Sequence, residues 1–391
     1  MLPSGAWELP EELQMLRDTV RRFMATEVLP LEEKLEHDAI GLPPEQRDVL
    51  REKAKALGLW CLRTPEDHGG AGLGLLATSI VAEEASKCRM GAYIPACGAF
   101  GVDPPNVIFM GTPDQIERYA KPMVEGRTRA FMAISEASGG SDPARSIRCR
   151  AERVGNKYIL NGSKMWITGA GRADWGVVYA RTGEQGQRGG ISSFIVDAGT
   201  PGLSMKPIGV IRSYEPYELT FENVEIPAEN LLGEEGQGFQ IAEKWLVEGR
   251  VPYAAGTIGV AQAALDLAIE WAKDRETFGK PLSERQAIQW MLADSEIELR
   301  AARLLVWQAA WKADLGQPMK VDASIAKVFA TETAFRVVDR CVQIFGGLGV
   351  AKEMPLERWF RELRIKRIGE GPSEVQRMVV ARSLLSGNRP G

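Results

Sequence analysis

Residues 157–167 read Lys157-Tyr158-Ile159-Leu160-Asn161-Gly162-Ser163-Lys164-Met165-Trp166-Ile167. Two short runs of strand-forming residues flank Asn161-Gly162, and Asn-Gly is a strong signal for a two-residue turn. The stretch therefore predicts a β-hairpin that turns at Asn161-Gly162. Further strand-like runs, separated by glycine and proline, extend this into an antiparallel β domain over residues 130–238; they are Trp175–Ala180, Ser193–Val196 and Glu218–Phe221.

The chain before this β domain has a helical period. Apolar residues recur at three- and four-residue steps at Leu13, Leu16, Val20, Phe23, Met24 and Val28. Residues 41–60 and 75–90 have a similar pattern, so we predict an N-terminal helical domain over residues 1–129. The glycine-rich segment 68–74 between them is predicted to be a loop, because it lacks the GxGxxG spacing of a dinucleotide fold and no strand precedes it.

The chain after the β domain returns to the helical period. Ala255–Asp274, Glu284–Leu315 and Asp322–Phe345 are long, alanine-rich and amphipathic, and the last is expected to end at Gly346-Gly347. Helices of this length are typical of a bundle. We therefore predict a four-helix-bundle domain over residues 239–391. The fold class is α+β, with helical, β and helical domains in that order.

Composition argues against several classes of function. Lys and Arg number 48 and Asp and Glu 52, whereas a dedicated nucleic-acid binder normally needs a basic surface. Five scattered cysteines without a CxxC pair, and only two histidines, argue against a zinc site or a disulfide framework. The N-terminus lacks the pattern of a targeting peptide, and no run of 18 apolar residues is present. We expect a cytoplasmic protein that uses no metal and binds neither nucleic acid nor membrane.

Two segments of the first 170 residues could bind a flat ligand. In Phe131–Asp142 the glycines allow close backbone approach, and Ser135 and Ser141 offer hydroxyl groups. The alternative there is an ordinary loop. In Trp166–Gly169 the tryptophan could cover an aromatic cofactor and Thr168 could hydrogen-bond to it. The alternative there is a core tryptophan capped by a turn.

Two segments of the C-terminal domain also carry candidate chemistry. Arg275 lies at the end of a predicted helix, just before a Gly/Pro break. It could pair with a pyrophosphate. The alternative is that its charge only interacts favourably with the dipole of that helix. Ser373 and Gln376 match a capping box, which predicts a helix that begins just after Ser373. Glu370 then lies in a glycine-flanked turn, from which it could project into a cavity. The alternative is a solvated turn glutamate.

Taken in order, these segments resemble the acyl-CoA dehydrogenase family along nearly the whole chain. SEASGGSD is similar to the flavin motif TEPxAGSD, GSKMWITGAG to NGxKxWITN, and RETFGKPLSERQ to RxxFGxxLxxxQ. VQIFGGLG and FRELRIKRIGEGPSEVQR resemble QxxGGxG and RDxxxxxIYEGTxxIQ. Each motif is short, but five in the same order and in a matching domain context are specific.

The resemblance implies that FAD binds between the β domain and the C-terminal helices, partly across a subunit interface. It also implies a homotetramer built as a dimer of dimers. By position, the residues at the flavin would be Met132, Ile134, Ser135, Ser141, Trp166 and Thr168. The residues at the rest of the cofactor, some of them from a neighbouring subunit, would be Arg275, Phe278, Gln286, Gln343, Gly347 and Pro372.

The reaction that the resemblance implies is α,β-dehydrogenation of an acyl-CoA thioester to a trans-2-enoyl-CoA, as in fatty acid β-oxidation. Glu370 would remove the α-proton while hydride leaves the β-carbon for flavin N5, and an electron-transfer flavoprotein would accept the electrons. Ser141, Arg250 and Gly371 would contact the substrate. Because a glutamate has an ordinary pKa of about 4.3, burial beneath a substrate should raise it toward the working pH.

Some members of the family carry the base one residue before the arginine that matches Arg250. Here Gly249 is at that place, and Glu248 lies one helical step of roughly 100° further back, which disfavours this alternative.

Departures from the family pattern keep some points open. Gly369 stands where tyrosine is frequent, which should enlarge or reshape the acyl pocket, and the length and branching of the acyl group stay undecided. An acyl-CoA oxidase-like enzyme and a non-catalytic flavin- or CoA-binding relative are the alternatives. The chain is shorter than long oxidases, which favours the dehydrogenase.

Overall fold

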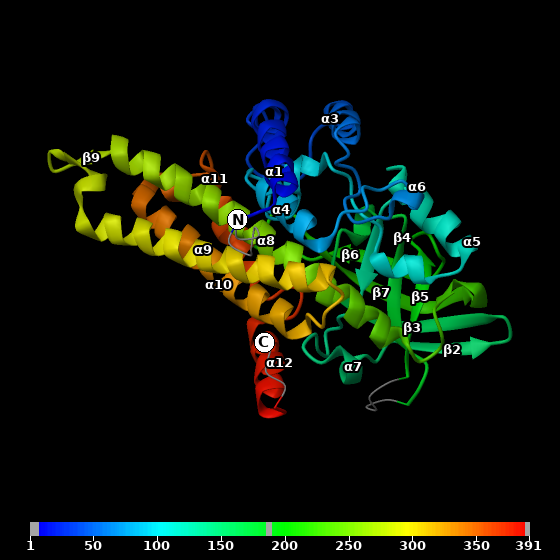
Figure 1. The fold of residues 1–391 in the computed structure, drawn as a ribbon. Coiled ribbons are helices and arrows are strands. Elements are labelled where there is room, and N and C mark those ends of the chain that lie inside the picture. The colour runs from blue at the N-terminus through cyan, green and yellow to red at the C-terminus, as the bar shows by residue number, and fades with distance from the viewer. Residues whose placement is uncertain (1–7, 185–189, 388–391) are drawn as a thin grey trace. The chain divides into compact units, whose positions relative to one another are not determined.

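The computed structural model describes residues 8–184 and 190–387, and the chain forms two compact units (Figure 1). Unit 1 contains residues up to Trp60, Leu73–Phe100, and the chain from Val247 onward. Unit 2 contains Cys61–Gly72 and Gly101–Leu246. The predicted N-terminal domain is therefore divided between the two units, which are described separately below.

Short helices form the N-terminal part of unit 1. Val20, Phe23 and Val28 are buried, so the face predicted from the helical period is the face that packs. A π-helical turn at Met24–Val28 interrupts the first helix. The helices of this part are α1 Glu11–Phe23, α2 Leu29–Glu32, α3 Pro44–Ala56 and α4 Leu75–Ala85.

Long helices form the rest of unit 1, and α8, α9 and α10 run side by side (Figure 1). Their bounds are α8 Gly238–Asp274, α9 Gln286–Asp314, α10 Lys320–Phe345, α11 Pro355–Lys366 and α12 Ser373–Leu385. Buried alanines such as Ala261 and Ala330 line their shared core, where small side chains permit close helix packing. As predicted, α10 ends at Gly346, whose φ of 64° is left-handed.

The first long helix begins much earlier than predicted. The sequence pattern placed its start at Ala255, whereas α8 begins at Gly238 and continues through Pro252. Proline removes one backbone hydrogen bond from a helix, but it does not end this one. Between α8 and α9 the chain forms a small antiparallel hairpin from β9 Glu276–Thr277 and β10 Lys280–Pro281.

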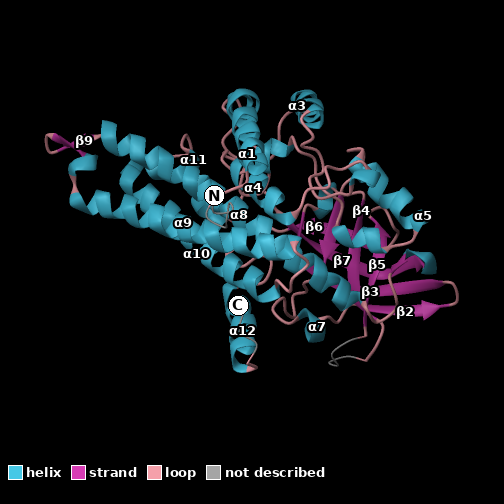
Figure 2. Cartoon of the chain, viewed as in Figure 1, coloured by secondary structure: helices cyan, strands magenta, loops and turns pink. Residues whose placement is uncertain are grey.

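An eight-stranded sheet is the centre of unit 2 (Figure 2). The strand order is β6-β7-β3-β2-β4-β5-β8, and β1 pairs with β4. Most pairs are antiparallel as predicted, but β1 runs parallel to β4, which the sequence did not indicate. The strands are β1 Ala130–Ala133, β2 Arg150–Val154, β3 Lys157–Thr168, β4 Trp175–Arg181, β5 Ile191–Asp197, β6 Leu203–Pro207, β7 Pro216–Pro227 and β8 Leu231–Leu232.

Both faces of this sheet carry a hydrophobic core. Alternate residues of β4 point to opposite faces, so Val178 belongs to one core and Val177 to the other. The Val177 core is completed by Tyr119 and by Ile241 in the first turns of α8. The short helices of this unit are α5 Pro113–Gln115, α6 Lys121–Val124 and α7 Pro143–Ser146.

The predicted hairpin turn at Asn161-Gly162 is wrong. β3 runs without a turn from Lys157 to Thr168, and the hairpin between β2 and β3 turns at Gly155-Asn156. Asn161-Gly162 lies instead at a bulge where the register with β7 shifts. A Cβ at Gly162 would lie 2.7 Å from the Cα of Cys149, so glycine is needed there for close backbone approach.

Within residues 8–184 and 190–387, no helix is both long enough and apolar enough to cross a bilayer. All five cysteines are buried free thiols.

Candidate active site

Glu370 lies in a strained turn between α11 and α12. Its φ is 56°, and that of Gly371 is 89°. A left-handed conformation costs a residue other than glycine about 1 kcal/mol, so the surroundings must hold Glu370 in it. The turn therefore has a defined conformation that the rest of unit 1 imposes.

Side chains from three helices hold this turn through its carbonyl groups. Arg250 Nε on α8 donates to the Glu370 carbonyl oxygen at 3.0 Å. Gln376 Nε2 on α12 donates to the carbonyl oxygens of Glu370 and Gly371 at 3.3 and 3.2 Å. Lys327 Nζ on α10 donates to the carbonyl oxygens of Arg367 and Gly371 at 3.2 and 2.9 Å. The two peptide groups that follow Glu370 and Gly371 are thereby held.

The predicted capping box at the start of α12 is wrong. The helix begins at Ser373, with Pro372 at the N-cap and no side chain of the described residues capping it. Gln376 is buried and donates to the turn carbonyls instead of to the N-cap backbone. The buried carbonyl groups of the turn need hydrogen-bond donors, because an unpaired buried carbonyl group is unfavourable. The Gln376 side chain is such a donor, so it does not form the capping box.

The Glu370 carboxylate is partly buried and incompletely satisfied. Its Oε2 is buried and accepts no hydrogen bond from the residues described. Burial raises the pKa of Glu370 above its ordinary value, while the cations Arg250, Lys366 and Lys327 act to lower it. A buried carboxylate oxygen without a partner is an exception among protein structures, and it fits a group that takes up a proton from a bound molecule.

The part played by Lys327 was not found from the sequence. Its side chain is 0% exposed, and burial lowers its pKa from 10.5 to about 8, while the nearby Glu370 carboxylate raises it. One signal was available, because Lys327 falls on the same stripe of the predicted helix as the buried Ala323 and Ala330. Lysine on a buried stripe is rare without a function or a partner.

The predicted flavin residues of unit 2 lie around the ends of β1 and β3. Trp166 occupies a bulge in β3, with φ of 67°, and its side chain is 53% exposed, so the alternative of a core tryptophan is wrong. Thr168 ends β3 and its Oγ1 accepts a hydrogen bond from Arg212 at 2.8 Å. On β1 and the loop after it lie Met132, Ile134 and Ser135, and Ser141 is exposed further along that loop.

A buried ion pair supports this region and was also missed. Lys164 Nζ lies 2.8 Å from Glu136 Oε1 and donates to the Ile134 carbonyl oxygen at 3.0 Å. The same carboxylate accepts the backbone N–H groups of Arg148 and Cys149 at 2.7 and 3.0 Å. The pair ties the segment after β1 to β3.

The hairpin of unit 1 carries some of the predicted cofactor residues. It lies in a different part of that unit from Glu370. Figure 1 shows the hairpin at the outer end of α8 and α9, far from α12. Phe278 at its tip has φ of 52° and is 98% exposed. The Arg275 guanidinium lies 5.8 Å from the Trp271 ring centroid, and that ring stacks on Phe345 at 4.9 Å. The other members of the set are Gln286 at the start of α9, Gln343 and Gly347, both exposed, and Pro372.

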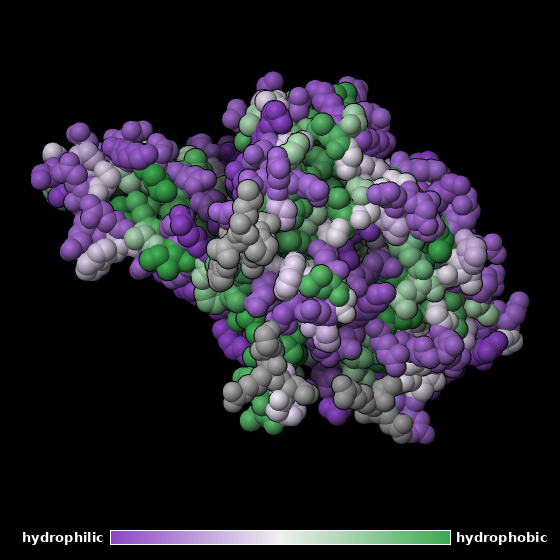
Figure 3. All heavy atoms as spheres, in the orientation of Figure 1, coloured by the Kyte–Doolittle hydropathy of each residue, from purple (hydrophilic) through white to green (hydrophobic). Residues whose placement is uncertain are grey.

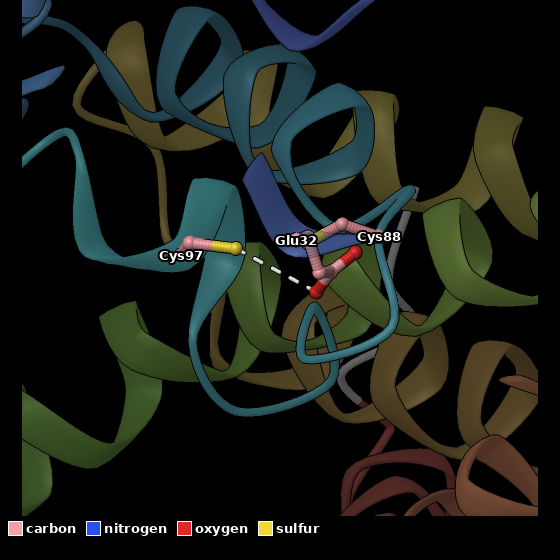
Figure 4. A group of neighbouring side chains, drawn as sticks. All are labelled: Glu32, Cys88 and Cys97. Atoms are coloured by element: carbon pink, nitrogen blue, oxygen red, sulfur yellow. Dashed lines mark hydrogen bonds between the residues drawn. The ribbon is translucent and has the colours of Figure 1, made fainter. Parts of the chain in front are cut away.

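A second titratable cluster in unit 1 contains Glu32, Cys88 and Cys97, whose ligand atoms lie within 4.8 Å of one another (Figure 4). Glu32 accepts the backbone N–H groups of Arg89 and Met90, both at 2.8 Å, and the Cys97 thiol at 3.5 Å. The contact with Cys88 and burial raise the pKa of Cys97, which opposes the thiolate that a metal would need. We interpret the cluster as structural. That the chain uses no metal stays a prediction.

Models of all three acyl-CoA dehydrogenase domains match the chain: the N-terminal domain over residues 10–127, the middle domain over 131–224 and the C-terminal domain over 236–385. The mitochondrial short-chain specific acyl-CoA dehydrogenase of Rattus norvegicus is 39% identical over 388 residues, which are 98% of this chain and 92% of that protein.

Solved structures agree with these matches. Butyryl-CoA dehydrogenase from Megasphaera elsdenii is 35% identical, with a TM-score of 0.84 over 97% of this chain and 99% of that chain. Glutaryl-coenzyme A dehydrogenase, solved with glutaryl-CoA, is 31% identical, with a TM-score of 0.84 over 98% and 97% of the two chains. An FAD complex of PigA, 27% identical, has a TM-score of 0.86 over 98% and 99%. The chain belongs to the acyl-CoA dehydrogenase family of FAD-dependent oxidoreductases.

Proposed function

We propose that this enzyme converts an acyl-CoA thioester to a trans-2-enoyl-CoA and that Glu370 is the catalytic base. The observation that supports this most is the buried Glu370 Oε2, which lacks a hydrogen-bond donor among the described residues, in a turn held by three helices. A carboxylate placed in this way has a fixed position and a raised affinity for protons.

The proposed step breaks two C–H bonds and forms one C=C bond. Glu370 takes the α-proton, and FAD, when bound, would supply the acceptor for the hydride that leaves the β-carbon. Because burial raises the pKa of Glu370, its carboxylate is a stronger base than an exposed glutamate. Because its backbone is fixed, little reorientation is needed when the proton is taken.

Three residues were predicted to contact the substrate, and the structure shows other uses for two of them. Arg250 donates to the Glu370 carbonyl oxygen, and the Gly371 carbonyl oxygen accepts from Lys327 and Gln376. We propose that Arg250 and Gly371 act on the substrate chiefly by holding the base. Ser141 is exposed. For this residue we propose a direct contact with the substrate.

The residues that we propose for FAD binding fit a flat aromatic ligand. In unit 2 the bulge at Trp166 exposes the indole, and the hydroxyl of Thr168 ends the same strand. In unit 1 the fully exposed Phe278 lies far from α12, which supports a contact with the cofactor of a neighbouring subunit. These are the groups that we assign to FAD, together with the rest of the predicted set.

A homotetramer is supported by the surface of α9. Trp290, Ile297, Leu304 and Trp311 recur every seven residues along this helix, and all are exposed in the single chain. Figure 3 shows hydrophobic side chains at the surface over α8 and α9, amid a mainly hydrophilic exterior. An apolar stripe of this kind marks a surface that another chain covers, and we propose that copies of this chain cover it.

The electron acceptor that we propose is an electron-transfer flavoprotein, in a cytoplasmic enzyme of fatty acid β-oxidation. An oxidase-like use of oxygen would produce peroxide in proportion to substrate consumed. Peroxide measured during turnover therefore separates the two acceptors.

The base is tested by Glu370→Gln, with Glu374→Gln as a matched control at an exposed position on α12. Both proteins should retain yellow, bound FAD. Anaerobic titration with a panel of acyl-CoA thioesters should bleach the flavin of the control but not that of Glu370→Gln. If no thioester bleaches the flavin of the unaltered enzyme, the non-catalytic alternative holds instead.

A further inference from the structure

The loop between β6 and β7 lies against the end of β3. Thr168, the last residue of β3, pairs with Pro216 at the start of β7. The Ile208 N–H donates to the Pro216 carbonyl oxygen at 2.8 Å, which closes the loop. Tyr214 packs against the turn after β3, since a Cβ at Gly169 would lie 2.9 Å from its hydroxyl oxygen. The loop is therefore held beside Thr168 by contacts within unit 2.

Arg212 lies in this loop and donates to Thr168. It is buried, with 7% of its surface exposed, and its Nη2 lies 2.8 Å from Thr168 Oγ1. A guanidinium group carries N–H donors and no acceptor, so the bond between the two side chains has one possible direction. The oxygen of Thr168 is the acceptor, and this holds whatever else the guanidinium group contacts.

The direction of this bond determines what the Thr168 hydroxyl offers to a ligand. Thr168 is exposed, and its hydroxyl forms no other hydrogen bond with residues 8–184 or 190–387. Arg212 uses one lone pair of the oxygen, so the proton must point away from the guanidinium group. A charged donor also polarises the hydroxyl, which strengthens it as a donor and weakens it as an acceptor. The exposed side of Thr168 is therefore chiefly a hydrogen-bond donor.

Resting on the proposed function, which places Thr168 at the flavin, we propose that Arg212 is a positioning residue for the cofactor. It presents the hydroxyl proton of Thr168 to an acceptor atom of the isoalloxazine ring. The edge of the oxidised ring consists mainly of acceptors, namely carbonyl oxygens and unprotonated nitrogens, so a donor at Thr168 matches it. The exposed indole of Trp166, two residues earlier on the same strand, is the flat surface that accompanies this donor.

A double-mutant cycle tests whether Arg212 acts through Thr168. Its members are the unaltered enzyme, Arg212→Met, Thr168→Val and the double variant, in which valine keeps the shape of threonine without the hydroxyl. Apoenzyme is titrated with FAD, and flavin fluorescence gives the dissociation constant. Each single variant should weaken FAD binding about 3- to 10-fold, the effect of one hydrogen bond. The double variant should bind little more weakly than Thr168→Val, because the two residues act as one unit.

Three further variants separate this role from loss of charge or of structure. Thr168→Ser keeps the hydroxyl and should keep most of the affinity. Arg172→Met removes an exposed arginine that lies 5.8 Å from the Tyr214 ring, beside the same loop, and should change the affinity less than about twofold. If Arg212→Met does not fold, Arg212→Lys replaces it in the cycle, because lysine keeps the charge but lacks the planar group that bonds to Thr168.

Two results would overturn the proposal. One is an equal loss of affinity from the Arg212 variant in the threonine and valine backgrounds, which would mean that Arg212 acts without Thr168. The other is a loss in Arg172→Met as large as that in the Arg212 variant, which would indicate a general effect of charge. These titrations use no thioester. Bound FAD that no acyl-CoA reduces would therefore reject the proposed function and leave the result of the cycle standing.

Discussion

The ammonium nitrogen of Lys327 lies 2.9 Å from the carbonyl oxygen of Gly371, the residue that follows the proposed base. The same nitrogen lies 3.2 Å from the carbonyl oxygen of Arg367, so one side chain of α10 spans the turn that carries Glu370. The position of the base therefore depends on a helix distant from it in the sequence, and Lys327 acts as a positioning residue.

Replacing Lys327 with methionine should slow the chemical step more than it weakens substrate binding. The methionine keeps the buried volume but leaves two turn carbonyls without their donor, and a base displaced by about 1 Å can lose about 100-fold in rate. We expect kcat to fall about 10- to 100-fold with little change in KM. Lys320→Met, at the exposed start of the same helix, is the control and should leave both values near those of the unaltered enzyme. Equal losses in kcat/KM and in bound FAD would indicate general damage instead.

The charge of Lys327 should make stability depend on pH in a defined direction. Its pKa is lowered to about 8, chiefly by burial, whereas an unfolded lysine titrates near 10.4. Between these values the unfolded chain binds more protons, so this group makes the folded state more stable as the pH rises from about 8 to 10. Below pH 8 the charged lysine costs the folded state about 3 kcal/mol, at about 1.36 kcal/mol per pKa unit.

Urea unfolding of the unaltered enzyme and of Lys327→Met, at pH 7 to 10, measures this term as a difference. The unaltered enzyme should gain stability relative to the variant as the pH rises. The charged groups around Lys327 are Glu370, Arg250, Glu332 and Glu374, and they are common to both proteins. A difference that does not change with pH would contradict the assignment.

The pH dependence of flavin reduction should report the raised pKa of Glu370. The base acts as the carboxylate, so the rate should rise with pH through an inflection above the ordinary 4.3 of a glutamate. Removing a cation that favours the carboxylate should move the inflection to higher pH. We therefore expect Lys366→Met to shift it upward, measured with a neutral short-chain thioester. Lys352→Met, an exposed lysine paired with Asp38, should not move it. A downward shift in Lys366→Met would be incompatible with this electrostatic account.

The buried ion pair of unit 2 should be costly to break from one side. Lys164→Met leaves the Glu136 carboxylate buried with only its two backbone donors, and such changes typically destabilise by about 3–5 kcal/mol. Lys157→Met on the same strand breaks an exposed pair with Glu225 and should cost at most about 1 kcal/mol. Thermal unfolding of both variants measures the two losses of stability. Similar losses would mean that the buried pair of Lys164 and Glu136 contributes no more to stability than the exposed pair.

The fold was predictable because long periodic segments determine most of it. The α-helical stripe through Val20 and Val28, the end of α10 at Gly346 and the strands β4, β5 and β7 followed from local patterns. The hairpin turn was misplaced because Asn161-Gly162 looks like a turn, while its actual role, close approach to Cys149, depends on a neighbouring strand. The start of α8 was misplaced because Pro252 is an interruption that tertiary packing overrides.

The candidate site was predictable only in part, for a similar reason. Glu370 stood out through its flanking glycines and through the family resemblance. Lys327 did not, because it acts through contacts with Arg367 and Gly371, which are far from it in the chain. The prediction of a capping box at Ser373 and Gln376 was wrong. The Gln376 side chain donates to buried carbonyl groups of the turn, and the local sequence does not show that these groups are buried.

The most direct test of the central claim follows the α-proton itself. A 3-thiabutyryl-CoA ester has acidic α-hydrogens but carries sulfur at the β-position, so no hydride can leave and only proton transfer is observed. In D2O, NMR should show FAD-loaded enzyme exchanging these α-hydrogens for deuterium, and Glu370→Gln should be slower by about 10²- to 10⁴-fold, the usual contribution of a general base. Exchange at the unaltered rate in Glu370→Gln that still holds FAD would contradict the account.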